Sequence, residues 1–319
     1  MATVSVMACA TEGFSLIRRR PWAFAGWILF WILLGVGPLL LAVAGLAPKF
    51  LDLISSLRSA RDAHDPDALR RIVDFEMGLW PLFGPWFLWM LVVGAVLYAA
   101  VYRAVLEPGK NAFAYLRLGM DEVRVFFTRI VIVLLSVVFF ALLAAGAAGL
   151  FVFSHNVIGH PWEGWFDAAV IILALCLFIW VMFRLSLALP MTFAEKHFRI
   201  FESWRLTRGN FWPLVGMRAM SIILIVAVAI GFGFVRQIVF LTVGLSTGAF
   251  SHLDSLTNVG ADLRKGLTDL MTAFGPALIA LFIIQAISDA ILRVIAIAPL
   301  ARAYAQLSGR DAPAEIGSF

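Results

Sequence analysis

The chain has 319 residues, of which 62% are hydrophobic and 14% are charged, and its mean hydropathy is +0.94. Soluble domains are about half apolar and about a quarter charged, so this composition excludes an ordinary soluble protein and indicates a membrane protein. The net charge of +5 does not by itself indicate nucleic acid, because the cytoplasmic loops of membrane proteins are enriched in basic residues. We therefore expect no nucleic-acid partner.

Six apolar runs are each long enough to cross the hydrocarbon core of a bilayer, which takes roughly 20 helical residues. Runs such as 130–135 do not alternate polar and apolar residues as the strands of a membrane barrel do, which predicts helices. The predicted fold is an all-α polytopic transmembrane bundle, a single domain over residues 1–310 with a short tail over 311–319. The predicted spans are 21–46, 80–102, 126–153, 168–190, 213–241 and 274–299.

The distribution of basic residues predicts the orientation of these helices. With the N-terminus inside, 17 of the 25 Lys and Arg residues fall on the cytoplasmic side and 8 on the other side. Both termini are therefore predicted to be cytoplasmic. The first apolar run is longer than the roughly 7–15 apolar residues of a signal peptide, so we expect it to be retained as a helix.

Two connecting segments on the opposite side from the termini carry apolar residues at helical spacing. Residues 49–75 are predicted to form two short helices separated by His64-Asp65-Pro66, and a second apolar stripe runs from Leu256 to Leu270. Two interpretations stay open. The helices lie in the plane of the membrane interface, or they pack on the ends of the bundle.

A short pattern, Phe-x-x-apolar-Arg, occurs three times shortly before an apolar run, at Phe14–Arg18, Phe113–Arg117 and Phe201–Arg205. Because the Phe and the apolar residue three positions later share one helix face, each copy is predicted to be a short amphipathic helix on the inner surface. The repetition favours three related helix hairpins. The alternative is the ordinary basic bias of cytoplasmic segments.

The third copy belongs to a longer stretch with Pro190, Glu195 and then Phe201-Glu202-Ser203-Trp204-Arg205-Leu206-Thr207-Arg208-Gly209-Asn210-Phe211-Trp212. This stretch resembles the membrane domain found next to bacterial glycerophosphodiester phosphodiesterases and related inner-membrane proteins. The resemblance implies a helical module of the bacterial inner membrane, without the phosphodiesterase, whose catalytic barrel would need some 200 further residues. Locally, Gly209 suits the position after a helix end, and Asn210 suits the N-cap of the next helix.

Asp289 lies near the middle of the sixth predicted span, with Gln285 one turn before it and Arg293 one turn after it. A charge at the centre of a bilayer costs roughly 2.5–3.5 kcal/mol on insertion scales, and such charges mark paired sites or pathways. Asp289 and Arg293 are interpreted first as an ion pair that fixes helix packing. The other interpretation, and the leading functional hypothesis, is a site for a substrate, a proton or a lipid headgroup.

Further basic residues lie close to the predicted inner interface. Arg184 and Arg218 are placed to extend their side chains towards water. Alternatively, Arg184 and Arg218 form a basic pocket for an anionic headgroup together with Arg293 and Arg302.

Evidence for metal binding or catalysis in the sequence is weak. His155, His160 and Glu163 are possible metal ligands, but histidines five residues apart do not share one helix face. Sequence signatures of a nucleophile elbow, of a phosphate-binding loop and of a Cys-x-x-Cys site are absent. We therefore expect neither a cofactor nor enzymatic activity.

Two functional hypotheses follow. The first is a non-enzymatic scaffold or assembly module of the envelope, with membrane lipids and other membrane proteins as partners. The second is a transporter or lipid-handling protein that works through Asp289, Arg293 and Arg184. The variant Asp289→Asn separates them, because only the second hypothesis predicts loss of transport or lipid binding in a normally folded protein.

Overall fold

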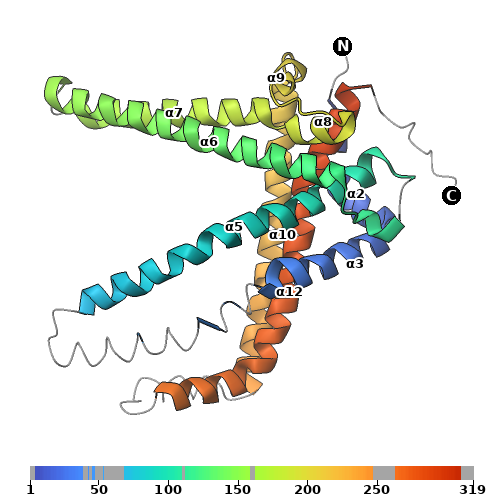
Figure 1. The fold of residues 1–319 in the computed structure, drawn as a ribbon, viewed down its shortest axis with the longest axis vertical. Helices are drawn as coiled ribbons and strands as arrows, with labels where there is room; N and C mark the ends of the chain where they lie inside the picture. Colours follow the sequence, from blue (N-terminus) through green and yellow to red (C-terminus); the bar gives the residue numbers. More distant parts are fainter. Residues whose placement is uncertain are drawn as a thin grey trace. The chain divides into compact units, whose positions relative to one another are not determined.

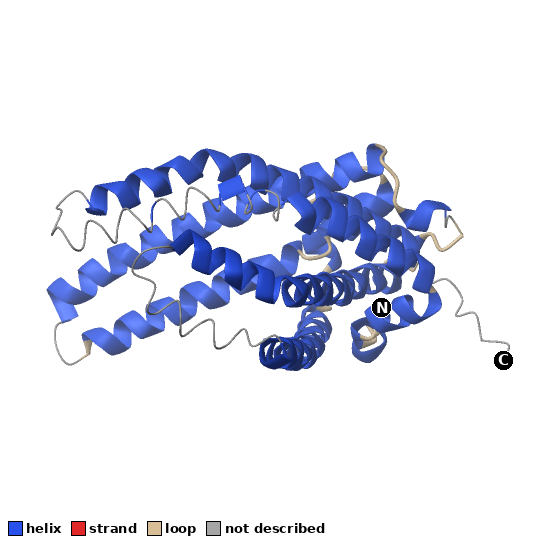
Figure 2. Cartoon of the chain, turned by 90° about the horizontal axis from the view of Figure 1, so that it is seen from below, coloured by secondary structure: helices blue, strands red, loops and turns tan. Residues whose placement is uncertain are grey.

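The computed structural model describes residues 4–38, 68–109, 112–158, 162–246 and 263–309, with Ala42, Gly45, Leu46 and Leu53. Throughout these residues the regular elements are helices, and none is a strand (Figure 2). The predicted all-α fold is confirmed. The predicted tail, 311–319, lies outside the described residues, and the single domain predicted over 1–310 stays a prediction.

Long helices make up most of the described chain (Figure 1). They are α3 (Pro21–Phe30), which continues into the π-helix η1 (Trp31–Val36), and α5 (Ala68–Leu106), α6 (Met120–Phe153), α7 (Glu163–Leu185), α10 (Phe211–Ser246) and α12 (Leu263–Leu307). Short elements connect or precede them: α1 (Val6–Ala10), α2 (Glu12–Arg19), η2 (Ala112–Tyr115), η3 (Ser154–Ile158), α8 (Ala188–Glu195) and α9 (Glu202–Leu206).

Within the described part of the chain, five helical stretches are long and apolar enough to cross a membrane: Ile72–Leu106, Phe113–Val157, Gly164–Glu195, Phe211–Val243 and Leu278–Leu307. They contain or largely overlap the second to sixth predicted spans. The first predicted span is described as a shorter apolar helix over Pro21–Val36, and five of its ten remaining residues lie outside the description. The chain is therefore a multi-pass integral membrane protein, and a count of six spans stays a prediction.

The connecting segments differ from the prediction where the structure describes them. Residues 68–75 are the first two turns of α5 and not a separate short helix, because the helix runs unbroken from Ala68 into the apolar span. Residues 263–270 are likewise the start of α12. The remainder of both segments, 49–52 with 54–67 and 256–262, lies outside the described residues.

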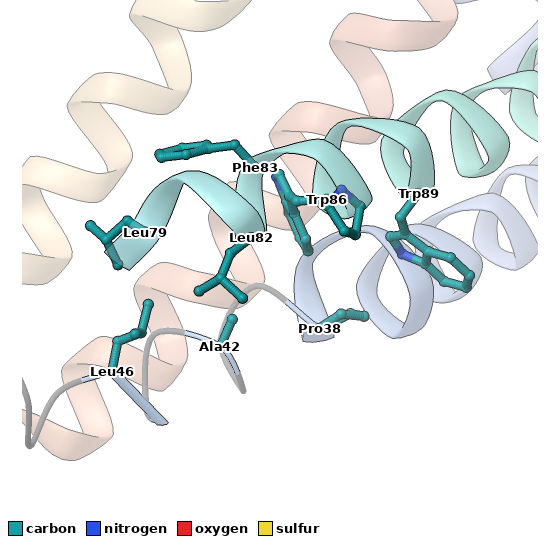
Figure 3. Close-up of a pocket in the computed structure, with 9 residues that line it drawn as sticks. Pro38, Ala42, Leu46, Leu79, Leu82, Phe83, Trp86 and Trp89 are labelled. Carbon is teal, nitrogen blue, oxygen red and sulfur yellow. The ribbon is translucent and has the colours of Figure 1, made fainter. Parts of the chain in front are cut away.

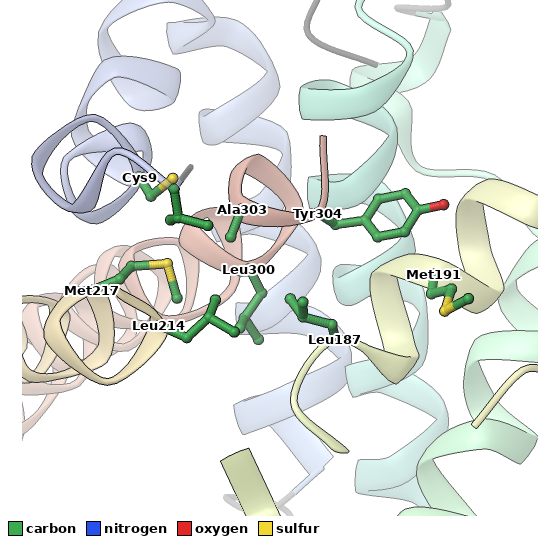
Figure 4. Packing of buried hydrophobic residues seen from close by; sticks show 9 residues of the cluster. Cys9, Leu187, Met191, Leu214, Met217, Leu300, Ala303 and Tyr304 are labelled. Carbon is green, nitrogen blue, oxygen red and sulfur yellow. The ribbon is translucent and has the colours of Figure 1, made fainter. Parts of the chain in front are cut away.

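The chain divides into two compact units, and the first comprises Met1–Pro21, Gly94–Ile222 and Val294–Phe319. In this unit α6 and α7 run side by side (Figure 1). Its hydrophobic core joins α1, the turn before α8, α8, the start of α10 and the end of α12 (Figure 4). The buried members of this core are Val4, Cys9, Leu187, Met191, Leu214, Met217, Leu300, Ala303 and Tyr304.

The three copies of the Phe-x-x-apolar-Arg pattern do not share one structure. The first lies in the helix α2, and the third begins one residue before α9. The prediction of a helix is wrong for the second copy, where Phe113, Ala114 and Tyr115 have φ values of +50°, +56° and +62° and form a left-handed turn. Tertiary contacts hold this turn, since Arg103 Nη1 donates to the Tyr115 carbonyl at 2.6 Å and the Tyr115 hydroxyl donates to the Pro108 carbonyl at 3.0 Å.

The second unit comprises Trp22–Val93 and Ile223–Arg293. It contains most of α3, all of η1, the first part of α5 and parts of α10 and α12. A π-helix forms i→i+5 hydrogen bonds and is frequently found at a functional site. The second unit, which contains η1, is therefore a candidate location for the functional site.

Candidate functional site

The predicted polar stripe on α12 is present and internally bonded. Gln285 Nε2 donates a hydrogen bond to Asp289 Oδ1 at 2.7 Å, and both side chains are half-buried. Their four-residue spacing places them on one face of the helix. The amide therefore satisfies one acceptor of a carboxylate that sits within a membrane-spanning helix.

Arg293, one turn further along, lies against an aromatic ring from η1. Its guanidinium carbon is 3.6 Å from the centroid of the Trp31 ring, a cation–π contact. Trp31 is 4% exposed, and its indole N–H is buried without a hydrogen-bond partner in the described structure. The ion pair between Asp289 and Arg293 stays a prediction.

Glycine explains how the large Trp31 ring fits against its own helix. A Cβ atom on Gly35 would lie 2.5 Å from the Trp31 ring, closer than any real contact. A side chain at this position would therefore displace the ring from its place beside Arg293.

The π-helix also explains an unexpected hydrogen bond. In a π-helix the carbonyl ladder shifts from i→i+4 to i→i+5 bonding, and such shifts leave carbonyl groups in need of other donors. The indole nitrogen of Trp89, on α5, donates to the Leu34 carbonyl at 2.8 Å. Because an unsatisfied backbone group in lipid costs several kcal/mol, this bond stabilises the irregular segment and joins it to α5.

An apolar cavity of about 600 Å³ lies between the residues after η1 and the first part of α5 (Figure 3). The described side chains that line it are all apolar or aromatic: Pro38, Ala42, Leu46, Leu79, Leu82, Phe83, Pro85, Trp86 and Trp89. The volume falls within the range of about 300–1,000 Å³ that is typical of small-molecule sites.

The segment around η1 lies next to both the cavity and the polar stripe: Trp31 contacts Arg293, and Pro38 lines the cavity. Trp89 lines the cavity and bonds Leu34, which lies three residues from Trp31. Seven residues separate Trp31 from Pro38 at the cavity wall, about 10 Å along a helix. The second unit therefore presents a charged and amide-bearing cluster within one or two helical turns of an apolar cavity. We call the two together the α12–α5 site.

Arg184 belongs to the first unit and has different surroundings. Its guanidinium carbon lies 5.4 Å from the ring centroid of Trp180, 5.6 Å from that of Trp204 and 5.8 Å from that of Phe211. Its Nη1 donates to Thr207 Oγ1 at 3.4 Å, and its backbone carbonyl accepts a bond from Ser203 Oγ at 2.9 Å. The stretch that carries the family resemblance thus folds around Arg184, which sequence spacing did not reveal.

The helix boundary within this stretch agrees with the prediction. Gly209 has φ +90°, the left-handed conformation expected after a helix end, and Asn210 directly precedes α10. The Asn210 carbonyl accepts the backbone N–H of Leu214 at 3.1 Å, as an N-cap residue does.

The other predicted arginines each have partners of their own. Arg218 Nη1 donates to the Ala296 carbonyl at 3.2 Å. Arg302 acts electrostatically on Glu12, whose pKa is raised by burial and lowered in part by Arg19 and Arg302. A pocket shared by Arg184, Arg218, Arg293 and Arg302 stays a prediction.

A cluster of charges around a buried ion pair, Arg103–Glu122, was not predicted. Arg103 is 4% exposed, its Nη2 lies 2.6 Å from Glu122 Oε1, and Lys196 Nζ lies 2.6 Å from Asp121 Oδ2. Arg124 also pairs with Asp121, at 3.0 Å. The pairs join the ends of α5, α6 and α8, so we interpret this cluster as structural.

The weak metal candidates do not assemble in the described residues. His155 lies exposed in η3, Glu163 begins α7, and His160 lies outside the description. Among the described residues no three His, Cys, Asp or Glu side chains gather as metal ligands.

Comparison with family models, with curated proteins and with solved structures finds no match to this chain. Chemically, the α12–α5 site offers a carboxylate, an amide and a guanidinium beside an apolar volume. That combination suits an amphiphile better than a small polar solute, because a solute would leave the apolar wall unused.

Proposed function

We propose that this integral membrane protein binds a membrane lipid at the α12–α5 site and is a lipid-handling protein. The observation that carries the proposal is the apolar cavity, whose lining begins at Pro38, two residues after η1, the helix whose Trp31 lies against Arg293. An acyl chain would occupy the cavity. Polar headgroup atoms would meet Arg293, Asp289 and the unpartnered N–H of Trp31.

Energetic considerations support this assignment. The acyl chain is already in apolar surroundings in the membrane, so its entry into the cavity involves no transfer from water, and the cavity has only to match the shape of the chain. The polar cluster supplies selectivity, because buried donors and acceptors reject a ligand that leaves them unpaired. A scaffold role has weaker support, because one of its three predicted amphipathic helices is a left-handed turn.

The bacterial inner membrane and cytoplasmic termini belong to the same proposal. They are supported by the family resemblance and by the bias of basic residues, respectively.

Filling the cavity tests the proposal. In Leu82→Trp the larger ring would displace part of a bound acyl chain, which predicts weaker lipid binding because the chain loses packing contacts in the cavity. The measurement is lipid binding to the purified protein by native mass spectrometry across a titration of phosphatidylglycerol. Leu142→Trp is the matched control, because Leu142 on α6 is about as exposed as Leu82 but lies outside the cavity.

Asp289→Asn tests the polar half of the site. We expect a folded protein whose lipid preference changes between anionic and zwitterionic headgroups. Equal lipid binding by the wild type, Leu82→Trp and Asp289→Asn would refute the proposal.

A further inference from the structure

Arg184 is a cation that lacks a counter-ion in the described part of the chain. No carboxylate forms an ion pair with it there, its one hydrogen-bond acceptor is Thr207 at 3.4 Å, and its Nε is buried without a partner. Arginine side chains within membrane proteins are otherwise paired with acids or with carbonyls. The charge therefore remains uncompensated.

The surrounding rings hold the guanidinium without neutralising it. Trp180, Trp204 and Phe211 come from α7, α9 and α10, and Trp180 and Trp204 pack edge to face at 5.0 Å. Cation–π contacts offset part of the desolvation of the charge, but they leave a net positive charge in place. The rings also fix the orientation of a planar group whose N–H donors match the oxygens of phosphate.

The adjacent segment adds positive charge. Arg205 and Arg208 are exposed and form no ion pair among the residues described, whereas Arg199 pairs with both Glu195 and Glu202. Three arginines therefore lie within or against the segment 204–208 without an acidic partner. Clustered basic residues at the end of a membrane helix are typical of sites for phosphate-bearing headgroups.

We infer that Arg184, with Thr207 and the aromatic rings around it, forms a second binding site, which takes a phosphate oxyanion. The phosphate is that of a phospholipid headgroup or a soluble phosphate. The guanidinium would donate to two phosphate oxygens, and Thr207, whose hydroxyl donates to the Trp204 carbonyl at 3.1 Å, would hold the guanidinium in place. This site lies wholly within the first unit and does not depend on the α12–α5 site.

The test compares three ligands with purified protein in detergent: phosphatidylglycerol, phosphatidylcholine and inorganic phosphate. Arg184→Gln is expected to weaken binding of phosphate-bearing ligand at least about tenfold, the loss of a charge-assisted bidentate contact. Arg199→Gln is the matched control and is expected to bind as the wild type does, because it removes a cation from the same region that already has acidic partners.

Comparing the three ligands shows whether the bound phosphate belongs to a phospholipid headgroup or to a soluble phosphate. Loss of phosphatidylglycerol binding in Arg184→Gln, with little response to inorganic phosphate in any variant, assigns a lipid headgroup. Loss of inorganic phosphate binding, with lipid binding unchanged, assigns a soluble phosphate.

Arg184→Lys keeps the positive charge and provides a second test in case Arg184→Gln does not fold. It is expected to stay folded and to bind several-fold more weakly than the wild type, because an ammonium lacks the planar fork of donors. Wild-type affinity for all three ligands in Arg184→Lys, or in a folded Arg184→Gln, would overturn the inference.

Discussion

The two halves of α5 have opposite surroundings although they form one helix. From Leu91 to Ala104 most side chains are buried, and small residues such as Ala99 and Ala100, both 0% exposed, allow neighbouring segments to approach closely. Earlier, Met77, Trp80 and Phe83 are more than half exposed, and Pro81 and Pro85 lie within the helix. Close packing thus holds the second half in place, while large rings and prolines leave a cavity beside the first.

Because of this contrast, we expect substitutions in the two halves to affect different properties: stability in the packed half and lipid binding in the open half. In the packed half, a substitution leaves a void or an unpaired charge, so its cost appears in unfolding. In the open half, lipid fills the space that a side chain vacates, so the cost appears in ligand binding. The following predictions test that separation, from the largest expected effect to the smallest.

Breaking the buried ion pair should have the largest effect. Glu122→Gln leaves Arg103 buried without its closest carboxylate, and removing one member of a buried pair costs about 3–5 kcal/mol. Thermal unfolding in detergent is expected to move to a clearly lower temperature. Glu202→Gln removes an exposed carboxylate paired with Arg199, should cost at most about 1 kcal/mol, and serves as the control. Similar losses of stability in both variants would show that the buried ion pair at Arg103 stabilises the fold no more than an exposed one does.

Truncating the core of the first unit comes next. Leu187 is fully buried, so Leu187→Ala should cost about 2–5 kcal/mol through lost burial and a cavity. Leu82→Ala, in the open half of α5, should change the unfolding temperature little and change lipid binding instead. If Leu82→Ala destabilises as strongly as Leu187→Ala, the first half of α5 is not open as described.

Relieving the left-handed turn after α5 should have a smaller and opposite effect. Ala114 has φ +56°, a conformation that costs an L-residue about 1–2 kcal/mol and costs glycine little. Ala114→Gly is therefore expected to raise the unfolding temperature slightly. Gly209→Ala, at φ +90°, should lower it. A lower unfolding temperature in Ala114→Gly would argue against a left-handed turn.

Glu12 should give the smallest effect, visible as a pH dependence. Burial raises its pKa above the usual value of 4.5, so protonation is favoured more strongly in the folded state than in the unfolded state. The stability that this supplies is complete below pH 4.5 and is lost as pH rises through the raised pKa. Glu12→Gln mimics the protonated acid. Its unfolding temperature should therefore rise relative to that of the wild type as the pH is raised from 4.5 to 7. A difference that does not vary with pH would contradict this.

Local patterns predicted much of the fold. Apolar run length identified the spans that the structure describes as long helices, and four-residue spacing correctly placed Gln285 and Asp289 on one helix face. Gly209 was recognised because a left-handed residue after a helix end is a local requirement of the backbone.

The remainder depends on contacts between residues that are distant in sequence. Trp89 bonds the carbonyl of Leu34, which lies 55 residues away in the π-helix η1, and no local pattern predicts that contact. Arg103 counts in the sequence only towards the basic bias of the cytoplasmic side, since nothing local indicates that Glu122 faces it. The turn at Phe113–Tyr115 contains no glycine, so local propensity predicted a helix and tertiary contacts overrode it.

The most direct test of the central claim is an experimental density map of the protein in a lipid nanodisc, examined at the α12–α5 site. The account predicts elongated density between Pro38, Leu82 and Trp86, with headgroup density close to Arg293 and Trp31. A cavity closed by tightly packed side chains, with Asp289 and Arg293 paired only with each other, would contradict it.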